Sequence, residues 1–536
     1  MTKEKKYIGG AFLIGIVYRL LMGLQGIDPT DMGFCMTFYQ NIFCHPESMT
    51  FYFNYYLTGL IGGLWHLVFG QFGLLGFRIL DTITMSAAIW LLYLSFRNWL
   101  TTPKLAAIGI LLSFLFPSFV ITFHYDTLSF LLMTASTYAL MRWQSSGNIA
   151  WLWTAGVWIG ICFFARIVNM SLAVLVILPF LWGVRQSWQK GLTDAAIFGG
   201  GIFAGIMAVL LLMAVLGHLP YFAAGLSEAY GTLNGHETSN TSSNLFAVYF
   251  KSYINIGLQM LVIGVVAVLY RDAEELSSHL KIAARTLLLA ALFVLVITSQ
   301  PYLSAVAIST LFLLLLPPSA FGLPPLMGYV LVCAYLFPFG SDIGIPGIFH
   351  WCGGLLIIPA TCCCRQIIRP WQRQVVWGVC LSIAFSMLYK MGMEAKGESA
   401  SRLSATTVAL PGSLNVMTDT ERAARYRNEV ARICEYGHDN PLLLIGNQAS
   451  ELYYATGKLP FTGNTQMGTF MGAALIERLD MRYKFYRQLP LIAFIMRGHD
   501  TDDVPEFRHA LLPWMMSHNY HLVYEDQDIE IFTAKK

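Results

Sequence analysis

Apolar stretches of about 20 residues recur along the first 390 positions, and short polar connections separate them. A helix of that length spans roughly 30 Å, the thickness of the hydrocarbon core of a bilayer. The pattern predicts a polytopic α-helical membrane protein. The fourteen candidate segments lie near 7–24, 52–69, 76–95, 104–122, 127–143, 149–165, 168–184, 193–216, 252–270, 284–300, 303–317, 325–340, 346–363 and 375–391.

The positions of Lys and Arg indicate which segments cross, because cytoplasmic loops are enriched in these residues. If 52–69 does not cross, one set of connections holds Lys3, Lys5, Lys6, Arg97, Lys104, Arg142, Arg185, Lys190, Arg271, Lys281, Arg285, Arg365, Arg369 and Arg373. The opposite set, before the C-terminal tail, holds Arg166 and Lys251, with Lys390 at the edge of the last span. We therefore expect about 13 transmembrane helices, a cytoplasmic N-terminus and an extracytoplasmic C-terminus, in a bacterial inner membrane. The segment 52–69 is rich in Tyr, Phe and Trp, which favour the membrane interface, so it would lie on the outer leaflet, or tilt into it or re-enter.

The last 145 residues have a different pattern. "NPLLLIGNQASELYYATGK" predicts a buried strand that runs into a helix, and "LPLIAFIMRG" and "HLVYEDQDIEIFTA" predict further strands. A segment of this length forms one small α/β domain. We expect two modules: a membrane module over 1–391, with outer loops 25–75 and 217–251, and an extracytoplasmic α/β domain over 392–536. Only 12% of the residues are charged, and we expect no nucleic-acid partner.

The first outer loop, "GIDPTDMGFCMTFYQNIFCHPES", carries acidic residues and contains no Lys or Arg. Asp28 and Asp31 stand within one turn of each other, a spacing that suits a general base with a supporting acid or a divalent cation site. Two solvated loop carboxylates are the simpler alternative. Cys35 and Cys44 share this loop, and outside the cytoplasm they would either pair in a disulfide or remain free.

Charged residues at the outer ends of three later spans are further candidates. Asp126 follows His124 at the start of a span, where an acid also favours the helix dipole. Arg166 lies where two spans meet, at a depth where cations are rare and usually paired or functional. Arg78 would form an ion pair with Asp81 at i, i+3, or bind a phosphate through its guanidinium fork.

Other polar residues would line a cavity on the outer face. These are Asn169, His236 in the long loop 217–250, and Asp342 and His350 in "FGSDIGIPGIFHW". Irregular backbone at membrane depth is tolerated where it lines such a cavity.

The motifs "DPTDMGF", "LVFGQFGLLGFRILDTI" and "HYDTLSFLL", together with the expected spans, resemble the GT-C membrane glycosyltransferases. That group includes protein O-mannosyltransferases and the lipid A aminoarabinose transferase. The resemblance is architectural over roughly 7–390 and motif-like in the first 180 residues. The chain departs from the group in having Asp-Pro-Thr-Asp where Asp-Glu is usual, and its "hPPl" motif is reduced to "CHPES".

The resemblance implies an inverting hexosyl or pentosyl transfer from a polyprenyl-phosphate sugar to a glycan, lipid or protein acceptor. Asp31, or else Asp28, would be the base. Arg78, Arg166, Lys251, His124 and Asp126 would bind the donor phosphate and its surroundings. Some members of the group use a divalent metal, for which Asp31, His124 and Asp126 would be the ligands; no other cofactor is implied.

Two other functions remain alternatives. A transporter or lipid-linked glycan flippase should place paired charges near the middle of its spans. A glycan polymerase or ligase that uses lipid-linked chains should rely on arginines in large outer loops, and loop 217–250 contains none.

Overall fold

The computed structural model describes most of the chain. The described residues are 3–28, 31–100, 102–115, 122–234, 242–298, 306–307, 310, 324–339, 352–363, 374, 378, 381–385, 407–410, 414–446, 449–465, 473–496 and 504–534. The predicted spans at 303–317 and 375–391 and the domain boundary at 391 fall largely outside these residues.

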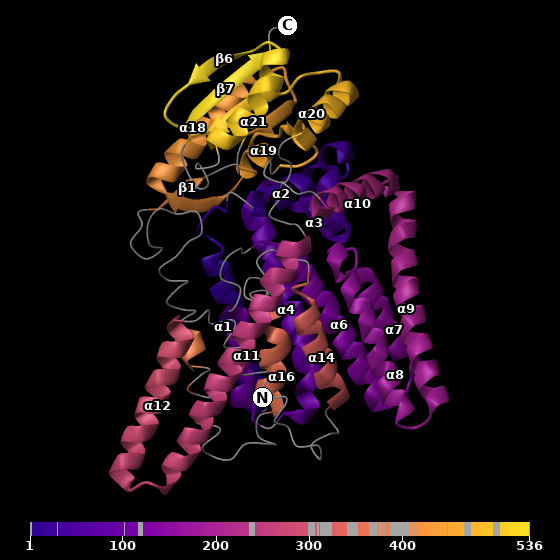
Figure 1. Cartoon of the computed structure of the whole chain (residues 1–536), viewed down its shortest axis with the longest axis vertical. Coiled ribbons are helices and arrows are strands. Elements are labelled where there is room, and N and C mark those ends of the chain that lie inside the picture. The colour runs from indigo at the N-terminus through magenta and orange to yellow at the C-terminus, as the bar shows by residue number, and fades with distance from the viewer. Residues whose placement is uncertain are drawn as a thin grey trace.

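A helical bundle carries the N-terminus at one end and a small sheet domain at the other (Figure 1). The helices of the bundle are α1 Lys3–Met22, α4 Gly73–Phe96, α5 Pro103–Leu115, α6 Tyr125–Ser146, α7 Ile149–Cys162, α8 Ile177–Val184, α9 Trp188–Val215, α11 Ser242–Asp272, α12 Ser278–Thr298, α14 Pro324–Leu336 and α16 Gly354–Cys363. Further helical elements connect them: α2 Asp31–Asn41, η1 Pro46–Tyr55, α3 Tyr56–Phe69, η2 Gly70–Phe72, η3 Arg97–Trp99, η4 Ile167–Val176, α10 Leu219–Asn234 and η5 Ala273–Glu275.

Several of these helices are apolar enough to lie in a membrane. Among the described residues, four helical stretches have the length and composition to cross one: Pro46–Trp99, Ile167–Val184, Trp188–Val215 and Phe246–Asp272. Shorter apolar helices cover Pro103–Leu115, Ile149–Cys162 and Leu326–Leu336. The fold class of a helical membrane protein with a small C-terminal sheet therefore holds, and the number of 13 spans stays a prediction.

Helix α3 corresponds to the aromatic segment that we expected not to cross. Its 14 residues span about 21 Å, which is less than the hydrocarbon thickness. Just before it, Phe51 donates its backbone N–H to Gly463 of the sheet domain, and near its end the His66 ring lies 5.9 Å from that of Tyr454 in the same domain. Both ends of α3 thus lie on the sheet-domain side of the bundle (Figure 1), and its interfacial placement stays a prediction.

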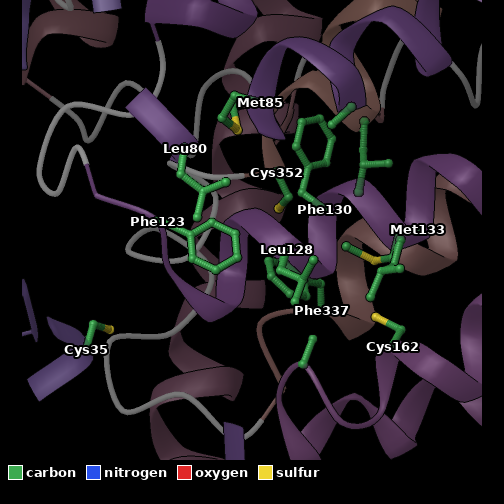
Figure 2. Packing of buried hydrophobic residues seen from close by; sticks show 14 of the residues in the cluster. Cys35, Leu80, Met85, Phe123, Leu128, Phe130, Met133, Cys162, Phe337 and Cys352 are labelled. Atoms are coloured by element: carbon green, nitrogen blue, oxygen red, sulfur yellow. The ribbon is translucent and has the colours of Figure 1, made fainter. Parts of the chain in front are cut away.

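The bundle core is a continuous hydrophobic cluster. Leu128 and Phe130 of α6 are buried in it together with Phe337 and Cys352 from the later helices (Figure 2). Close backbone contact between α7 and α9 closes one side of the bundle. A Cβ added at Gly156 or Gly160 of α7 would lie 2.1 Å from the carbonyl oxygen of Phe198 or Ile202, respectively. Small residues at i, i+4 allow membrane helices to approach this closely.

The C-terminal domain is built on a five-stranded sheet of order β4-β3-β5-β7-β6. Strands β4, β3 and β5 are parallel, β7 pairs antiparallel with β5, and β6 pairs antiparallel with β7. A separate antiparallel pair, β1–β2, precedes it. The elements are β1 Thr407–Leu410, β2 Val416–Asp419, α18 Thr420–Tyr436, β3 Leu442–Ile445, α19 Glu451–Thr456, β4 Leu459–Pro460, α20 Ala473–Tyr486, β5 Leu491–Ile495, α21 Val504–Ser517, β6 Tyr520–Glu525 and β7 Ile529–Ala534. The three strand predictions made for this region are confirmed.

Alternate residues of β3 belong to two different cores. Leu442 and Leu444 pack with α20 and α21, whereas Leu443 and Ile445 belong to the cluster that continues into the bundle. One face of the sheet is therefore buried against the same core as the membrane helices. The end of the first span also bonds directly to β2, because Met417 exchanges backbone hydrogen bonds with Leu24 and Gly26.

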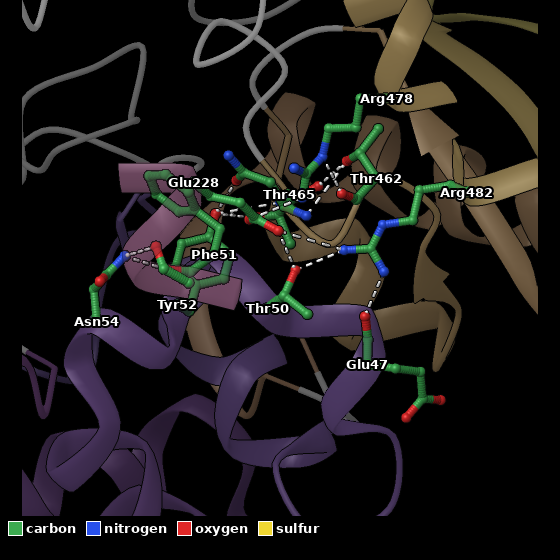
Figure 3. Close-up of polar contacts among 12 residues, drawn as sticks. Glu47, Thr50, Phe51, Tyr52, Asn54, Glu228, Thr462, Thr465, Arg478 and Arg482 are labelled. Carbon is green, nitrogen blue, oxygen red and sulfur yellow. Dashed lines mark hydrogen bonds and ion pairs between the residues drawn. The ribbon is translucent and has the colours of Figure 1, made fainter. Parts of the chain in front are cut away.

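A buried polar cluster fixes the sheet domain to the first loop and to α10 (Figure 3). Glu228 of α10 accepts hydrogen bonds from Arg478 at 2.9 Å and from Thr50 of η1 at 2.9 Å. Arg482 donates to the Thr50 hydroxyl at 2.6 Å and to the Glu47 carbonyl at 2.7 Å. Burial lowers the pKa of Arg482, and the neighbouring Arg478 charge lowers it further. The negative charge of Glu228 thus offsets the positive charges of both arginines where α10, η1 and α20 meet.

We expect Gly160→Ala to lower the stability of the detergent-solubilised protein by about 1–3 kcal/mol, because its Cβ would overlap the α9 backbone. Thermal unfolding measures the change. Gly200→Ala is the matched control, since a Cβ there meets nothing within 4 Å. Equal melting temperatures for the two variants would contradict the close α7–α9 contact.

Glu228→Gln should destabilise the protein by about 1.5–3 kcal/mol, the usual cost of losing hydrogen bonds to a charged group. The control is Glu435→Gln, because Glu435 pairs with Arg432 at 2.7 Å but is 56% exposed, where a pair contributes little. If both variants have the same melting temperature, Glu228 does not stabilise this junction.

Candidate active site

A buried ion pair lies where α6 begins and α7 ends, at the sheet-domain end of the bundle. Arg166 donates through Nη1 to Asp126 Oδ1 at 3.3 Å and to the Phe337 carbonyl at 3.3 Å. Its guanidinium also lies 5.6 Å from the centre of the Tyr125 ring. His124 is the N-cap of α6 and accepts from the Asp126 N–H. The structure thus brings together three residues that the sequence predicted separately.

The Asp126–Arg166 pair includes a polar atom that another molecule could contact. Asp126 is fully buried, yet within the described part of the chain its Oδ2 has no hydrogen-bond partner. Both of the hydrogen bonds described above for Arg166 are donated by Nη1. A buried polar atom without a partner costs free energy, so such atoms mark places where a ligand or ordered water binds.

The two aspartates of the first loop differ in exposure. Asp28 is 4% exposed, whereas Asp31, the first residue of α2, is half-buried. The negative charge of Asp31 acts on Asp126 and on Tyr55, so Asp31 lies within electrostatic range of the pair. An acid at this position is favoured by the positive end of the α2 dipole.

Stacked aromatic rings connect α2, η1 and α6 around these groups. Phe34 stacks on Tyr52 at 4.7 Å between ring centres, and Tyr55 stacks on Tyr125 at 4.2 Å. Such pairs favour offset or edge contacts and keep the surrounding backbone in place. The rings therefore fix the start of α2 relative to the start of α6.

Arg78 has different partners from the predicted ones. Its guanidinium donates to the carbonyls of Gly23 and Gly26 at the end of α1, which it caps, and it remains within electrostatic range of Asp81. Asp81 takes Arg19 as its hydrogen-bonded ion pair and accepts from Thr127 at 2.7 Å. The expected Arg78–Asp81 ion pair is not formed as predicted, because the residues after α1 accept hydrogen bonds from Arg78 while Arg19 of α1 pairs with Asp81.

Two other predicted residues lie away from this group. Lys251 is exposed on α11, whereas Tyr249, two positions earlier, is buried and feels the charge of Arg166. Residues at i and i+2 point about 200° apart on a helix, so Lys251 faces away from Arg166. Asn169 donates to Ser129 at 2.8 Å and to the Cys162 carbonyl at 3.0 Å, which ties η4 to α6 and α7, and its place in a cavity wall stays a prediction.

The remaining predictions concern three cavity residues and one disulfide. His236, Asp342 and His350 lie outside the described residues. Cys35 is buried and Cys44 is exposed, and both are free thiols, so the disulfide is not formed.

The side chains named for a divalent metal have other neighbours in this structure. Arg166 contacts Asp126 Oδ1 at 3.3 Å, and His124 Nδ1 lies 3.6 Å from the other oxygen. Among the described residues, no group of three or more His, Cys, Asp or Glu side chains is arranged to hold a metal ion. A metal site at these residues stays a prediction.

Sequence reasoning missed the residues that the sheet domain contributes. Glu228 and Arg478 are 250 positions apart, and Glu451 packs over Gly33 from 418 positions away. No local pattern connects residues at such separations. The one available signal was the isolated Glu451 within a run of otherwise apolar and small residues, "ASELYYATG".

A solved structure is similar to this chain along its length. The crystal structure of ArnT from Cupriavidus metallidurans in the apo state aligns with 99% of this chain and 98% of that one, at 12% identity and a TM-score of 0.41. No family model matches the chain, and no curated protein matches it.

Proposed function

We propose that this protein is an inverting membrane glycosyltransferase that moves a sugar from a polyprenyl-phosphate donor to an acceptor at the sheet-domain end of the bundle. The observation that carries the proposal is the buried Asp126–Arg166 pair with the half-buried Asp31 in electrostatic range. A carboxylate oxygen without a hydrogen-bond partner among the described residues, a buried guanidinium and a half-buried acid suit transfer from a phosphate leaving group.

Asp31 is the proposed base because it alone of Asp28, Asp31 and Asp126 keeps partial exposure. Its carboxylate takes the proton of an acceptor hydroxyl or amide as that group attacks the anomeric carbon. The new bond forms on the face opposite the phosphate, so the configuration inverts. The bond between the anomeric carbon and the phosphate oxygen breaks, and its electron pair stays on the phosphate.

Arg166 is the proposed phosphate ligand. The leaving phosphate gains negative charge as the bond breaks, and a fixed guanidinium stabilises that charge without reorganising. Nε and Nη2 would bind phosphate oxygens while Nη1 stays on Asp126. Asp126 Oδ2 would accept a hydroxyl of the sugar or of the acceptor.

The membrane placement follows from exposure and charge. Large apolar side chains are exposed along α9 and α11, including Phe203, Leu211, Leu261 and Val265, and they suit contact with lipid tails. The distribution of Lys and Arg supports a cytoplasmic N-terminus and an extracytoplasmic sheet domain. The site would then face the outer leaflet, where the donor headgroup lies.

A transporter or flippase is the second candidate, and the buried Arg19–Asp81 pair is the feature that favours it. Asp81 is the ninth residue of α4, about 12 Å from the sheet-domain end of that helix. Arg19 lies one turn from the end of α1. The pair therefore sits in the same third of the bundle as the site, rather than at the midplane.

Asp31→Asn should leave the protein folded and reduce transfer by about 10²–10⁴-fold, the usual contribution of a general base. The assay offers purified protein a panel of polyprenyl-phosphate sugars and measures released polyprenyl phosphate by mass spectrometry. Glu47→Gln is the control in the same loop, since its carboxylate contacts only His45 among the described residues, at 3.4 Å. Equal release by wild type and Asp31→Asn would remove Asp31 as the base.

Arg166→Lys should raise the KM for the donor about tenfold or more with little change in melting temperature, because lysine keeps the charge but loses the fork. Arg142→Lys is the control, since Arg142 stacks on Trp151 at the far end of α6. An unchanged KM in Arg166→Lys would place the phosphate elsewhere.

A further inference from the structure

Helix α19 of the sheet domain rests directly on α2. A Cβ at Gly33 would lie 2.2 Å from the backbone nitrogen of Glu451, so the two segments are in backbone contact there. Thr37 of α2 also donates to the Ser450 carbonyl at 3.4 Å. Glu451 follows the carboxyl end of β3, the edge at which open parallel sheets usually bind ligands. The sheet domain thus meets the first loop at the helix that Asp31 begins.

Glu451 is a buried acid in this contact. It is 5% exposed, and among the described residues its Oε2 has no hydrogen-bond partner. The charges that act on it come from two directions. Arg422 and Glu429 face it from α18, and Asp28 faces it from the segment before α2. The titratable groups on α2 itself are Asp31, Cys35 and Tyr39.

These surroundings favour the neutral acid. Burial raises the pKa of Glu451 to about 8, Arg422 opposes the rise, and the charges of Glu429 and Asp28 add to it. Burial raises the pKa of Glu429 to about 7 as well. An ionised Glu451 would place a second negative charge near the buried Asp28, on the segment that leads to Asp31.

We infer that Glu451 is a positioning residue, whose buried carboxyl group lies at the contact between the sheet domain and α2 and thereby holds Asp31 at the site. The effect on transfer rests on the proposed function, whereas the effect on stability does not. If Glu451 lost its proton, its negative charge would repel that of Asp28 and loosen the contact between α19 and α2.

The proton on Glu451 makes the free energy of unfolding depend on pH. A carboxyl group with a raised pKa binds its proton more tightly in the folded state than in the unfolded state. Its contribution is complete below the unfolded pKa of about 4.5, is lost as the pH rises to about 8, and changes no further above that value. Replacement by glutamine removes this dependence, because the amide does not ionise.

The experiment uses the full chain in detergent, as wild type, Glu451→Gln and the exposed control Glu435→Gln. Melting temperature is measured from pH 5 to pH 9. We expect wild type and Glu435→Gln to lose stability between pH 5 and pH 8, and Glu451→Gln to lose clearly less. A Glu451→Gln curve parallel to wild type would overturn the inference. So would failure of Glu451→Gln to fold at pH 7, since glutamine has the shape of the neutral acid.

Release of polyprenyl phosphate is then followed over the same range. At pH 9, one unit above the pKa, about a tenth of Glu451 remains neutral, so wild type should release about tenfold less than at pH 7. Glu451→Gln should retain its rate within about twofold. Equal losses in both would refute the positioning role. If no variant releases donor at any pH, the proposed function fails while the melting curves still decide the role of Glu451.

The variant Glu429→Gln distinguishes the role of Glu451 from that of Glu429, the other acid whose pKa is raised by burial. It should change the melting curve, because Glu429 also titrates near pH 7, but it lies one helix away from α2 and should leave the alkaline loss of transfer in place. An alkaline loss that disappears in Glu429→Gln and persists in Glu451→Gln would assign the role to Glu429 and contradict the inference.

Discussion

A carboxylate removed from water must be paired with a cation or hold a proton, and this requirement organises the sheet-domain end of the bundle. Asp126 is paired with Arg166, Asp81 with Arg19, and Glu228 with Arg478. Each pair joins elements that are distant in the chain, so neutralising the charge also fixes the packing. Glu451 has Arg422 nearby but no direct ion pair among the described residues, and a proton meets the requirement there. The contacts that neutralise these buried charges are therefore also contacts that hold the tertiary structure together.

The sheet domain is part of this arrangement rather than an appended module. One face of its sheet shares the hydrophobic core of the bundle, and the loops after β3 and β4 contact α2 and η1. The acids of the first loop therefore lie beneath a second layer of protein. A site enclosed between membrane helices and a sheet domain can exclude water from a reacting sugar while the lipid tail of a donor remains outside the bundle. That geometry suits chemistry at the membrane boundary better than passage through it.

Much of this could be predicted from local patterns. The apolar periods predicted the helices, the strand patterns in the tail predicted β3, β5, β6 and β7, and the scarcity of outer cations drew attention to Arg166. The pairing of those residues was harder to predict, because it depends on which helices become neighbours. Arg78 and Asp81 are adjacent on one helix face, yet Arg78 donates to the residues after α1 and Asp81 pairs with Arg19 of α1. Lys251 was chosen for its charge, whereas the helix phase turns it away from Arg166. The contribution of Glu451 required the tertiary fold, since its contact with Gly33 spans most of the chain.

The most direct test of the account is a cryo-electron microscopy structure of the full chain in nanodiscs loaded with polyprenyl phosphate. The account predicts phosphate density within hydrogen-bonding distance of the Arg166 guanidinium, beside Asp126 and beneath the sheet domain, with the lipid tail leaving the bundle sideways. Phosphate density at the N-terminal end of the bundle, or along a path through its middle past Arg19 and Asp81, would contradict a transferase site at Asp31 and favour a transporter.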